Sequence, residues 1–412
     1  MLLVNNVAVE RLRKVLLTLL FVSLSLPVAI QQTVLGCAWA LLSYSIWTRG
    51  AIPRTPLDRP LLLFFAALVL AALFCPSVGS SLLGSRKLWL VSAFFVVYHL
   101  LADEREAWQM TVTALGTAVV VAAFGVSQHY TGFDLSHWLT GKPPAVEPFW
   151  FGRYEGFRTE GMFPSGITYA HNLLFPLTFV TAWLMASHVT RRQRFALFLG
   201  WGVMLLALLF TLTRGVWVAY AVVLLGLAVM KGRRALLPVG ACLVAMGLAV
   251  TLVSPGVWER AYYAFDLQTN FARTQIWQAN LDMIRDRPIL GWGYGNYKKF
   301  REPYYQRYPQ SDTNAHAHNN FLQMWVDAGI VGLAAFLFLF WSLLHLGWRA
   351  YQRLPVEAEP LRTLALGGTV SMLGFLVGGF TQYNFGDAEV AIAMWIIAGV
   401  LVRVAAWAQA RT

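Results

Sequence analysis

Long apolar runs alternate with short basic segments along most of the chain. A hydrocarbon core about 30 Å thick needs about 20 apolar residues per helix, and by that measure the pattern predicts about twelve membrane-spanning helices. Their ranges are 14–30, 33–48, 61–77, 87–102, 110–128, 166–187, 195–212, 216–230, 235–253, 320–346, 363–383 and 388–404. The pattern therefore predicts an all-α polytopic protein with a single membrane domain over residues 1–412.

Basic residues predict the orientation of these helices. Five short segments carry three basic residues each, namely the N-terminal tail, 49–60, 188–194, 231–234 and 349–362. With about twelve spans these segments share one side, and basic loops are typically cytoplasmic. Both termini are therefore predicted to be cytoplasmic. The Arg86–Lys87 pair, on the outer side, is a mild exception to this rule.

Two long segments, 129–165 and 254–319, fall on the outer, periplasmic side and hold most of the polar residues. The first is aromatic and rich in glycine and proline, which is typical of an ordered cap and not of a helix. The second is predicted to contain short helices, including an amphipathic one over 274–286. One apolar face of that helix carries Ile276, Trp277, Asn280, Leu281 and Ile284, and Pro288 ends it.

Composition supports the assignment to a membrane. The chain has 412 residues, of which 58% are hydrophobic and 13% charged, whereas soluble domains have about 25% charged residues. The net charge of +12 is explained by the basic loops, so no nucleic-acid partner is predicted. Cys37, Cys75 and Cys242 all lie in apolar runs, which argues against a disulfide framework or a metal cluster.

A polar cluster stands at the start of the span over 320–346. It contains His316, His318 and Asn319, and Gly329 and Gly332 follow within the helix. A lone histidine at a membrane interface can be structural, but a histidine can also act as a general base near neutral pH. No third histidine or HExxH motif lies nearby, so metal-independent chemistry is favoured and no cofactor is predicted.

Two arginines on the outer side are candidates for binding phosphate. Arg214 lies in a turn and is followed by Gly215, and Arg273 opens the amphipathic helix. A guanidinium binds phosphate oxygens in a bidentate manner, and a helix N-terminus also favours an anion. Together the two could clamp a diphosphate, although a snorkelling arginine and a solvated helix-end charge remain alternatives.

Three further residues are candidates for substrate binding. Asp387, between the last two spans, could orient the acceptor. Tyr304 and Tyr305 could stack on sugar faces, and interfacial aromatic residues are the alternative interpretation.

In these motifs the chain resembles the superfamily of O-antigen ligases and O-antigen polymerases, and it is most similar to the ligases. The H-[N/S/Q]-x9-G-x-x-G pattern is matched by His318, Asn319, Gly329 and Gly332. A T-x-R-G element is matched by 211–215 with one spare residue, and R-x-x-x-W…P-x-x-G-x-G by Arg273, Trp277, Pro288, Gly291 and Gly293. The motifs cover 205–332, and the predicted topology extends the resemblance to the whole chain.

The resemblance implies a metal-independent, inverting glycosyltransferase of GT-C architecture in the bacterial inner membrane, with a periplasmic active site. The donor would be a glycan on undecaprenyl diphosphate, and the acceptor a sugar hydroxyl of lipid A–core, with membrane lipids around them. Arg214 and Arg273 would stabilise the leaving diphosphate, and His318 would act as general base. Asn319, His316, Asp387, Tyr304 and Tyr305 would contact substrate.

Three other functions stay open. A repeat-unit polymerase for O-antigen or exopolysaccharide would use the same donor. A protein O-oligosaccharyltransferase is disfavoured, because such relatives usually carry a further C-terminal domain. A transporter of lipid-linked glycans would need no general base, and the sequence lacks the matched pair of interrupted helices that many carriers have.

Overall fold

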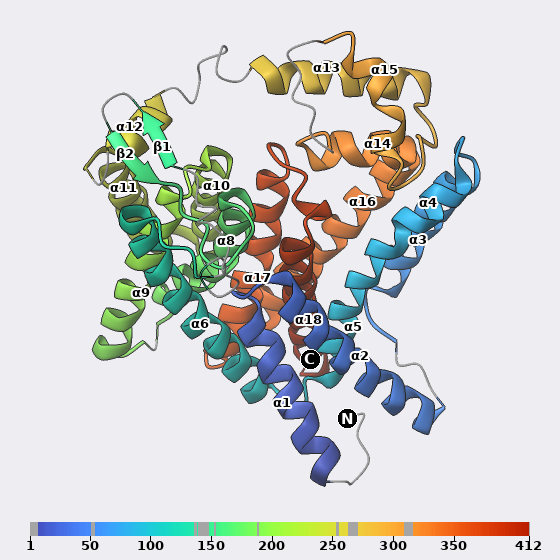
Figure 1. Ribbon diagram of the computed structural model, residues 1–412. Coiled ribbons are helices and arrows are strands. Elements are labelled where there is room, and N and C mark those ends of the chain that lie inside the picture. The colour runs from blue at the N-terminus through green and yellow to red at the C-terminus, as the bar shows by residue number, and fades with distance from the viewer. Residues whose placement is uncertain are drawn as a thin grey trace.

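The computed structural model describes residues 7–50, 54–135, 138, 148–151, 154–187, 189–252, 255–262, 271–308 and 316–411. Most of these residues are helical, and the long helices form one bundle (Figure 1). Helix α1 begins at one end of the bundle, and helices α13 (Phe271–Asp286), α14 (Tyr297–Phe300) and α15 (Glu302–Tyr305) lie at the opposite end. This opposite end is called the α13 end below.

Each predicted span coincides with a helix. Eleven of them match single helices: α1 (Val7–Ser23), α2 (Val28–Arg49), α3 (Asp58–Leu73), α6 (Glu104–Thr131), α8 (Gly166–Leu184), α9 (Arg191–Phe210), α10 (Arg214–Lys231), α11 (Leu236–Leu252), α16 (Asn320–Arg353), α17 (Glu359–Gly378) and α18 (Ala388–Ala410). The remaining one is a continuous run of α4 (Val78–Gly84), η1 (Ser85–Val91) and α5 (Ser92–Leu100).

Seven of the described helical segments are long and apolar enough to cross a membrane. This confirms an all-α integral membrane protein, while the number of twelve spans stays a prediction. Helices α17 and α18 lie at the centre of the bundle, where α17 contacts α8, α10, α16 and α18. Both central helices are buried on nearly all sides, which explains why their sequences are apolar all round.

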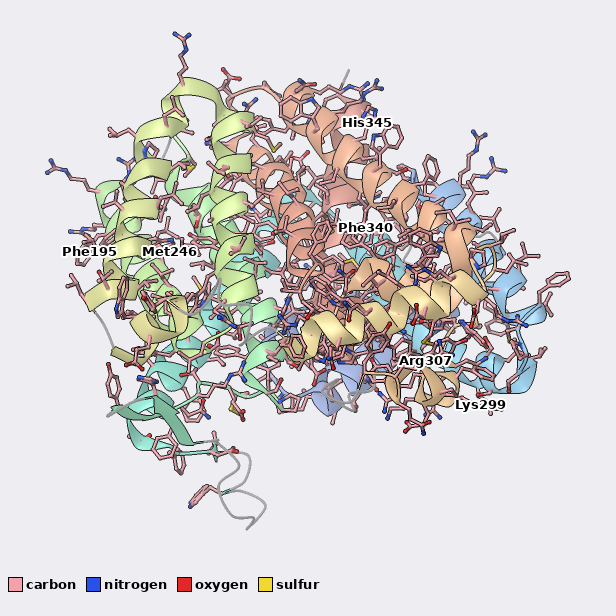
Figure 2. All side chains as sticks on the ribbon, turned by 90° about the horizontal axis from the view of Figure 1, so that it is seen from above. Phe195, Met246, Lys299, Arg307, Phe340 and His345 are labelled. Carbon is pink, nitrogen blue, oxygen red and sulfur yellow. The ribbon has the colours of Figure 1, made fainter. Side chains whose placement is uncertain are left out.

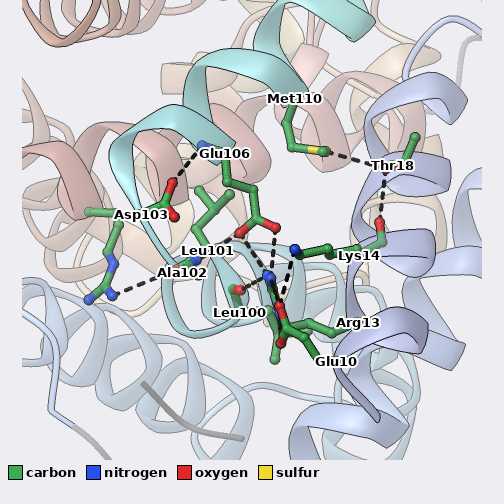
Figure 3. Close-up of polar contacts among 11 residues, drawn as sticks. Glu10, Arg13, Lys14, Thr18, Leu100, Leu101, Ala102, Asp103, Glu106 and Met110 are labelled. Atoms are coloured by element: carbon green, nitrogen blue, oxygen red, sulfur yellow. Dashed lines mark hydrogen bonds and ion pairs between the residues drawn. The ribbon is translucent and has the colours of Figure 1, made fainter. Parts of the chain in front are cut away.

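A buried arginine joins helices α1 and α6 (Figure 3). Arg13 is only 2% exposed, and its guanidinium donates to both carboxylate oxygens of Glu106 at 2.7 Å. It also donates to the carbonyl of Leu100 at 2.6 Å and to Glu10. A charge can be buried when it is paired and hydrogen-bonded in this way. The basic N-terminal segment therefore contributes to the packing of the bundle as well as to its predicted orientation.

The segment over 129–165 contains two short strands at the α13 end. Strand β1 (Pro148–Phe151) pairs antiparallel with β2 (Tyr154–Phe157), while α6 extends to Thr131. Parts of the predicted outer segments, including 139–147, 263–270 and 309–315, lie outside the described residues. Among the residues described, α6 ends at Thr131, and the later part of the segment consists of this strand pair and of turns over 158–165, so most of it is not helical, as its composition predicted.

The amphipathic helix is confirmed as α13, which contacts α15 and α16. Ile276, Asn280 and Ile284 are buried, as predicted. The prediction was wrong for Leu281, which is 42% exposed. Ala279 and Met283 are buried in its place, so the contact face is rotated slightly from the predicted one.

Candidate active site

Helix α16 is broken at Gly329, and the segment over 288–293 lies in the break. Gly329 has φ 65° and ψ −168°, in the region that favours glycine, and a Cβ there would lie 2.0 Å from the carbonyl oxygen of Ile289. Backbone hydrogen bonds join the two pieces: Trp292 N–H to Val326 O at 2.8 Å, Gly293 N–H to Asp327 O at 2.9 Å and Ile330 N–H to Pro288 O at 2.9 Å. The two glycine motifs of the sequence therefore meet here, and 288–293 pairs the backbone groups that the break exposes.

The start of α16 is fixed to the connection between α17 and α18, residues 379–387. Asn319 is the N-cap residue: its Oδ1 accepts from the N–H groups of Phe321 at 2.8 Å and Leu322 at 3.0 Å. Its Nδ2 donates to the carbonyl of Phe380 at 3.0 Å, and the Asn320 N–H donates to Gly379 O at 2.7 Å. The predicted substrate-binding residue Asn319 thus has its side chain engaged in positioning the helix.

Gln382 in the same connection fixes the ring of His318. The Nδ1 atom of His318 lies 2.7 Å from Oε1 of Gln382. With the amide in this orientation Oε1 is an acceptor, so Nδ1 carries the proton of the neutral ring and Nε2 carries the lone pair. This is the tautomer that a general base acting through Nε2 requires. Gln382 belongs to none of the sequence motifs and was missed.

His316 lies against His318, with ring centroids 4.3 Å apart. Its Nδ1 accepts from the backbone N–H of His318 at 3.2 Å, so in the neutral ring the proton is on Nε2. Burial, followed by the electrostatic influence of His318 and of the cations Lys87, Arg301 and Arg273, lowers the pKa of His316 to about 4. His316 is therefore neutral at pH 7 and carries its proton on Nε2.

The predicted convergence of Arg214 and Arg273 stays a prediction. Burial, and next the positive charge of Arg214, lower the pKa of Arg273, so the two guanidinium groups are within electrostatic range of each other. Arg214 is the first residue of α10, and Arg158 Nε donates to the carbonyl of Thr211 at 2.8 Å in the turn before it. Two neighbouring cations of this kind favour an anion between them.

Helix α10 reaches the same connection that holds His318. A Cβ on Gly215 would lie 2.0 Å from Oγ1 of Thr381, so glycine lets the start of α10 pack closely on 379–387. Gln382 is the next residue and contacts His318. The arginine turn and the histidine are thus held by adjacent residues of one short connection, although about a hundred residues separate them along the chain.

A cavity of about 610 Å³ opens beside this group. Its polar and aromatic lining residues come from four parts of the chain: Arg86, Lys87, Tyr294, Tyr297, Lys298, His316, Gln323, Asp327, Gln382, Tyr383 and Asp387. The predicted residue Asp387 is on the wall, and its Oδ2 accepts from Thr168 Oγ1 at 2.6 Å. Arg86 and Lys87 were not predicted as site residues. In the sequence, the only indication of a role for this pair was its predicted position on the outer side, where basic residues are uncommon.

Tyr304 and Tyr305 are placed in a packed cluster and not on the cavity wall. Each is 7% exposed and contacts the buried face of α13. The hydroxyl of Tyr304 donates to Asp286, and that of Tyr305 pairs with Tyr297 at 2.8 Å. Both rings therefore stabilise the α13–α15 layer, and neither lines the cavity.

Two comparisons with known proteins bear on this site. A protein-family model described as O-antigen ligase matches residues 199–337, a range that includes Arg214, Arg273, His318 and the break at Gly329. The chain is also 27% identical, over 257 residues, to an O-antigen ligase of Salmonella typhimurium (strain LT2). That alignment covers 57% of this chain and 60% of the relative, so the chain spans less than two thirds of the relative's length.

Proposed function

Both comparisons confirm the resemblance to the O-antigen ligase superfamily, and on that premise we propose that this membrane protein is an O-antigen ligase. It transfers a glycan from undecaprenyl diphosphate to a sugar hydroxyl of lipid A–core. The α13 end faces the periplasm, and both termini are in the cytoplasm of the inner membrane. The proposal is carried by one observation: the connection over 379–387 holds both the His318 ring and the start of α10, where Arg214 lies.

Arg214 and Arg273 bind the diphosphate of the donor. The bond from the anomeric carbon to the diphosphate oxygen breaks, and negative charge builds on the leaving group. Two guanidinium groups within electrostatic range of each other would stabilise that charge more in the transition state than in the ground state. A single displacement of this kind inverts the anomeric centre.

His318 activates the acceptor. Its Nε2 takes the proton of the attacking sugar hydroxyl while the oxygen forms the new bond to the anomeric carbon. Gln382 accepts from Nδ1 in the neutral ring and also in the imidazolium that forms. His316, neutral and with its proton on Nε2, donates to an oxygen in the cavity and so positions the acceptor.

The test is a transfer assay with the purified protein in nanodiscs, supplied with undecaprenyl-diphosphate-linked glycan and lipid A–core. We expect His318→Ala to lower the transfer rate by about 10²–10⁴-fold, as loss of a general base does. His345→Ala is the matched control, since His345 lies towards the other end of α16, stacked on Trp341. An equal rate for His318→Ala and the unsubstituted protein would contradict the proposal and favour transport of the lipid-linked glycan.

The same assay separates ligase from polymerase. Incubation with donor alone lengthens the glycan on its carrier if the protein is a repeat-unit polymerase, whereas a ligase forms product only with lipid A–core. We further propose that transfer needs no metal ion. In the part of the chain that the structure describes, no group of three His, Cys, Asp or Glu side chains is placed to hold one. A chelator should leave the rate unchanged.

A further inference from the structure

Three cations on the wall of the cavity have no role in the chemistry described above. Arg86 and Lys87 come from η1, and Lys298 comes from α14. All three side chains are exposed, and within the described ranges none of them forms a hydrogen bond or an ion pair. Three unpaired positive charges around one cavity raise the local concentration of anions.

Neighbouring cations at the α13 end are paired. Lys299 donates to Ser77 Oγ at 2.7 Å, Arg285 pairs with Asp282 at 2.7 Å, and Arg307 lies 3.8 Å from the same carboxylate. Figure 2 looks down on the α13 end and labels Lys299 and Arg307 beside α13. These three cations have polar partners within the protein, whereas no partner of Arg86, Lys87 or Lys298 is found among the described residues.

The floor of the cavity carries an unpaired acceptor. Asp327 is 2% exposed, and its Oδ2 accepts from Gln323 Nε2 at 3.1 Å, while its Oδ1 has no hydrogen-bond partner in the described chain. Buried polar atoms are nearly always hydrogen-bonded. The second carboxylate on the wall, Asp387, accepts a hydrogen bond from Thr168. A hydroxyl group entering the cavity would satisfy Oδ1 of Asp327.

Aromatic side chains form the walls between rim and floor. Tyr294 and Tyr383 line the cavity, and burial raises the pKa of Tyr294 to about 12, so its hydroxyl stays protonated at neutral pH. Aromatic faces contact the apolar faces of sugar rings, and hydroxyl groups supply hydrogen bonds at their edges. The volume of about 610 Å³ lies within the range of small-molecule sites.

We propose that this cavity is the acceptor subsite and that it selects an acceptor sugar bearing an anionic group. The sugar hydroxyls bind Asp327 and His316, and the anionic group binds Lys87, Arg86 and Lys298 at the rim. This rests on the proposed ligase function, in which Arg214 and Arg273 bind the donor. The two substrates thus use separate sets of cations. Both sets lie within electrostatic reach of His316, since Lys87 and Arg273 each lower its pKa.

The test compares Lys87→Gln and Lys298→Gln with Lys299→Gln. The last variant removes the same charge from the adjacent residue, which lies outside the cavity lining. Transfer kinetics are measured with phosphorylated lipid A–core, with the same glycolipid after phosphatase treatment, and with a carboxyl-reduced glycolipid. The two treated acceptors distinguish a phosphate from a carboxylate as the recognised anion.

We expect Lys87→Gln and Lys298→Gln to raise the KM for the untreated acceptor by about tenfold. The donor KM and kcat should stay unchanged, and Lys299→Gln should match the unsubstituted protein. One of the two treated acceptors should abolish the difference between variants. An unchanged acceptor KM in both cavity variants would overturn the proposal, as would a rise confined to the donor KM.

Acceptor binding without donor keeps this test independent of the reaction. Native mass spectrometry of the nanodisc-embedded protein with each glycolipid reports the charge preference even if no transfer occurs. Preferential binding of the untreated glycolipid, lost in Lys87→Gln and retained in Lys299→Gln, supports the subsite. Equal binding of all the glycolipids by the unsubstituted protein overturns it. Absent transfer together with retained preference would contradict the ligase function alone.

Discussion

Replacing Gln382 with leucine removes the atom that accepts from His318 Nδ1 at 2.7 Å. In the proposed mechanism the ring becomes an imidazolium when it takes the acceptor's proton, so this hydrogen bond would be stronger in the transition state than before it. A hydrogen bond to a charged group contributes about 1.5–3 kcal/mol, and about 1.4 kcal/mol is tenfold in rate. We therefore expect kcat to fall by about 10- to 100-fold, less than for His318→Ala, because the base itself remains.

The assay is kcat with saturating donor and acceptor, measured from pH 5 to 9 (about the range in which histidine titrates). Gln382→Glu is the informative companion variant. Its carboxylate still accepts from Nδ1 and adds a negative charge that stabilises the imidazolium. Since the charged ring cannot take a proton, the acid limb of the pH–kcat profile should move to higher pH while activity at alkaline pH is retained.

Gln306→Leu is the matched control, because Gln306 is an exposed glutamine at the same end of the molecule. Thermal unfolding of all variants reports whether packing is disturbed. The reasoning is refuted if Gln382→Leu keeps the kcat of the unsubstituted protein. It is also refuted if leucine and glutamate lower kcat equally, with the same acid limb and unchanged thermal unfolding, because the loss would not depend on an acceptor at Nδ1.

Three further predictions address stability and donor binding. Gly329→Ala should destabilise the purified protein by about 1–3 kcal/mol or more in thermal unfolding, because φ is 65° and the new Cβ meets the backbone of 288–293. Gly240→Ala is the control and should leave thermal unfolding unchanged, because a Cβ there meets no atom within 4 Å. Arg13→Met should cost about 3–5 kcal/mol in the same measurement because Glu106 is left buried and unpaired, and a smaller loss than for an exposed ion pair would contradict this. Arg214→Lys keeps the charge but loses bidentate binding, so the donor KM should rise about tenfold, and a normal KM would argue against the clamp.

Features with a local physical cause could be predicted from the sequence. Each predicted span coincides with a helix. A run of about 20 apolar residues favours a helix in an apolar environment, regardless of which other helices pack against it. The buried face of α13 followed from the spacing of Ile276, Asn280 and Ile284. The polar entry to α16 was found because a polar cluster directly precedes a long apolar run there, whereas the capping role of Asn319 was seen only in the structure.

Features that depend on distant segments could not be predicted. Gln382 lies 64 residues from His318, and a glutamine in a polar connection carries no local signal of its partner. The burial of Tyr304 and Tyr305 depends on how α15 packs against α13, which spacing within a four-residue helix cannot show. The break at Gly329 is stable only because another segment, nearly forty residues earlier, supplies its hydrogen bonds.

That break restricts the route by which substrates reach the site. The segment over 288–293 connects α13 to α14, and its N–H groups bond to the carbonyls of Val326 and Asp327. Lifting the α13–α15 layer would leave those carbonyls unpaired among apolar side chains, at a cost of several kcal/mol for each group. These bonds tie the layer to α16 and oppose its opening as a lid. For the proposed ligase, we therefore expect a donor on a polyprenyl tail to reach the site from the lipid side.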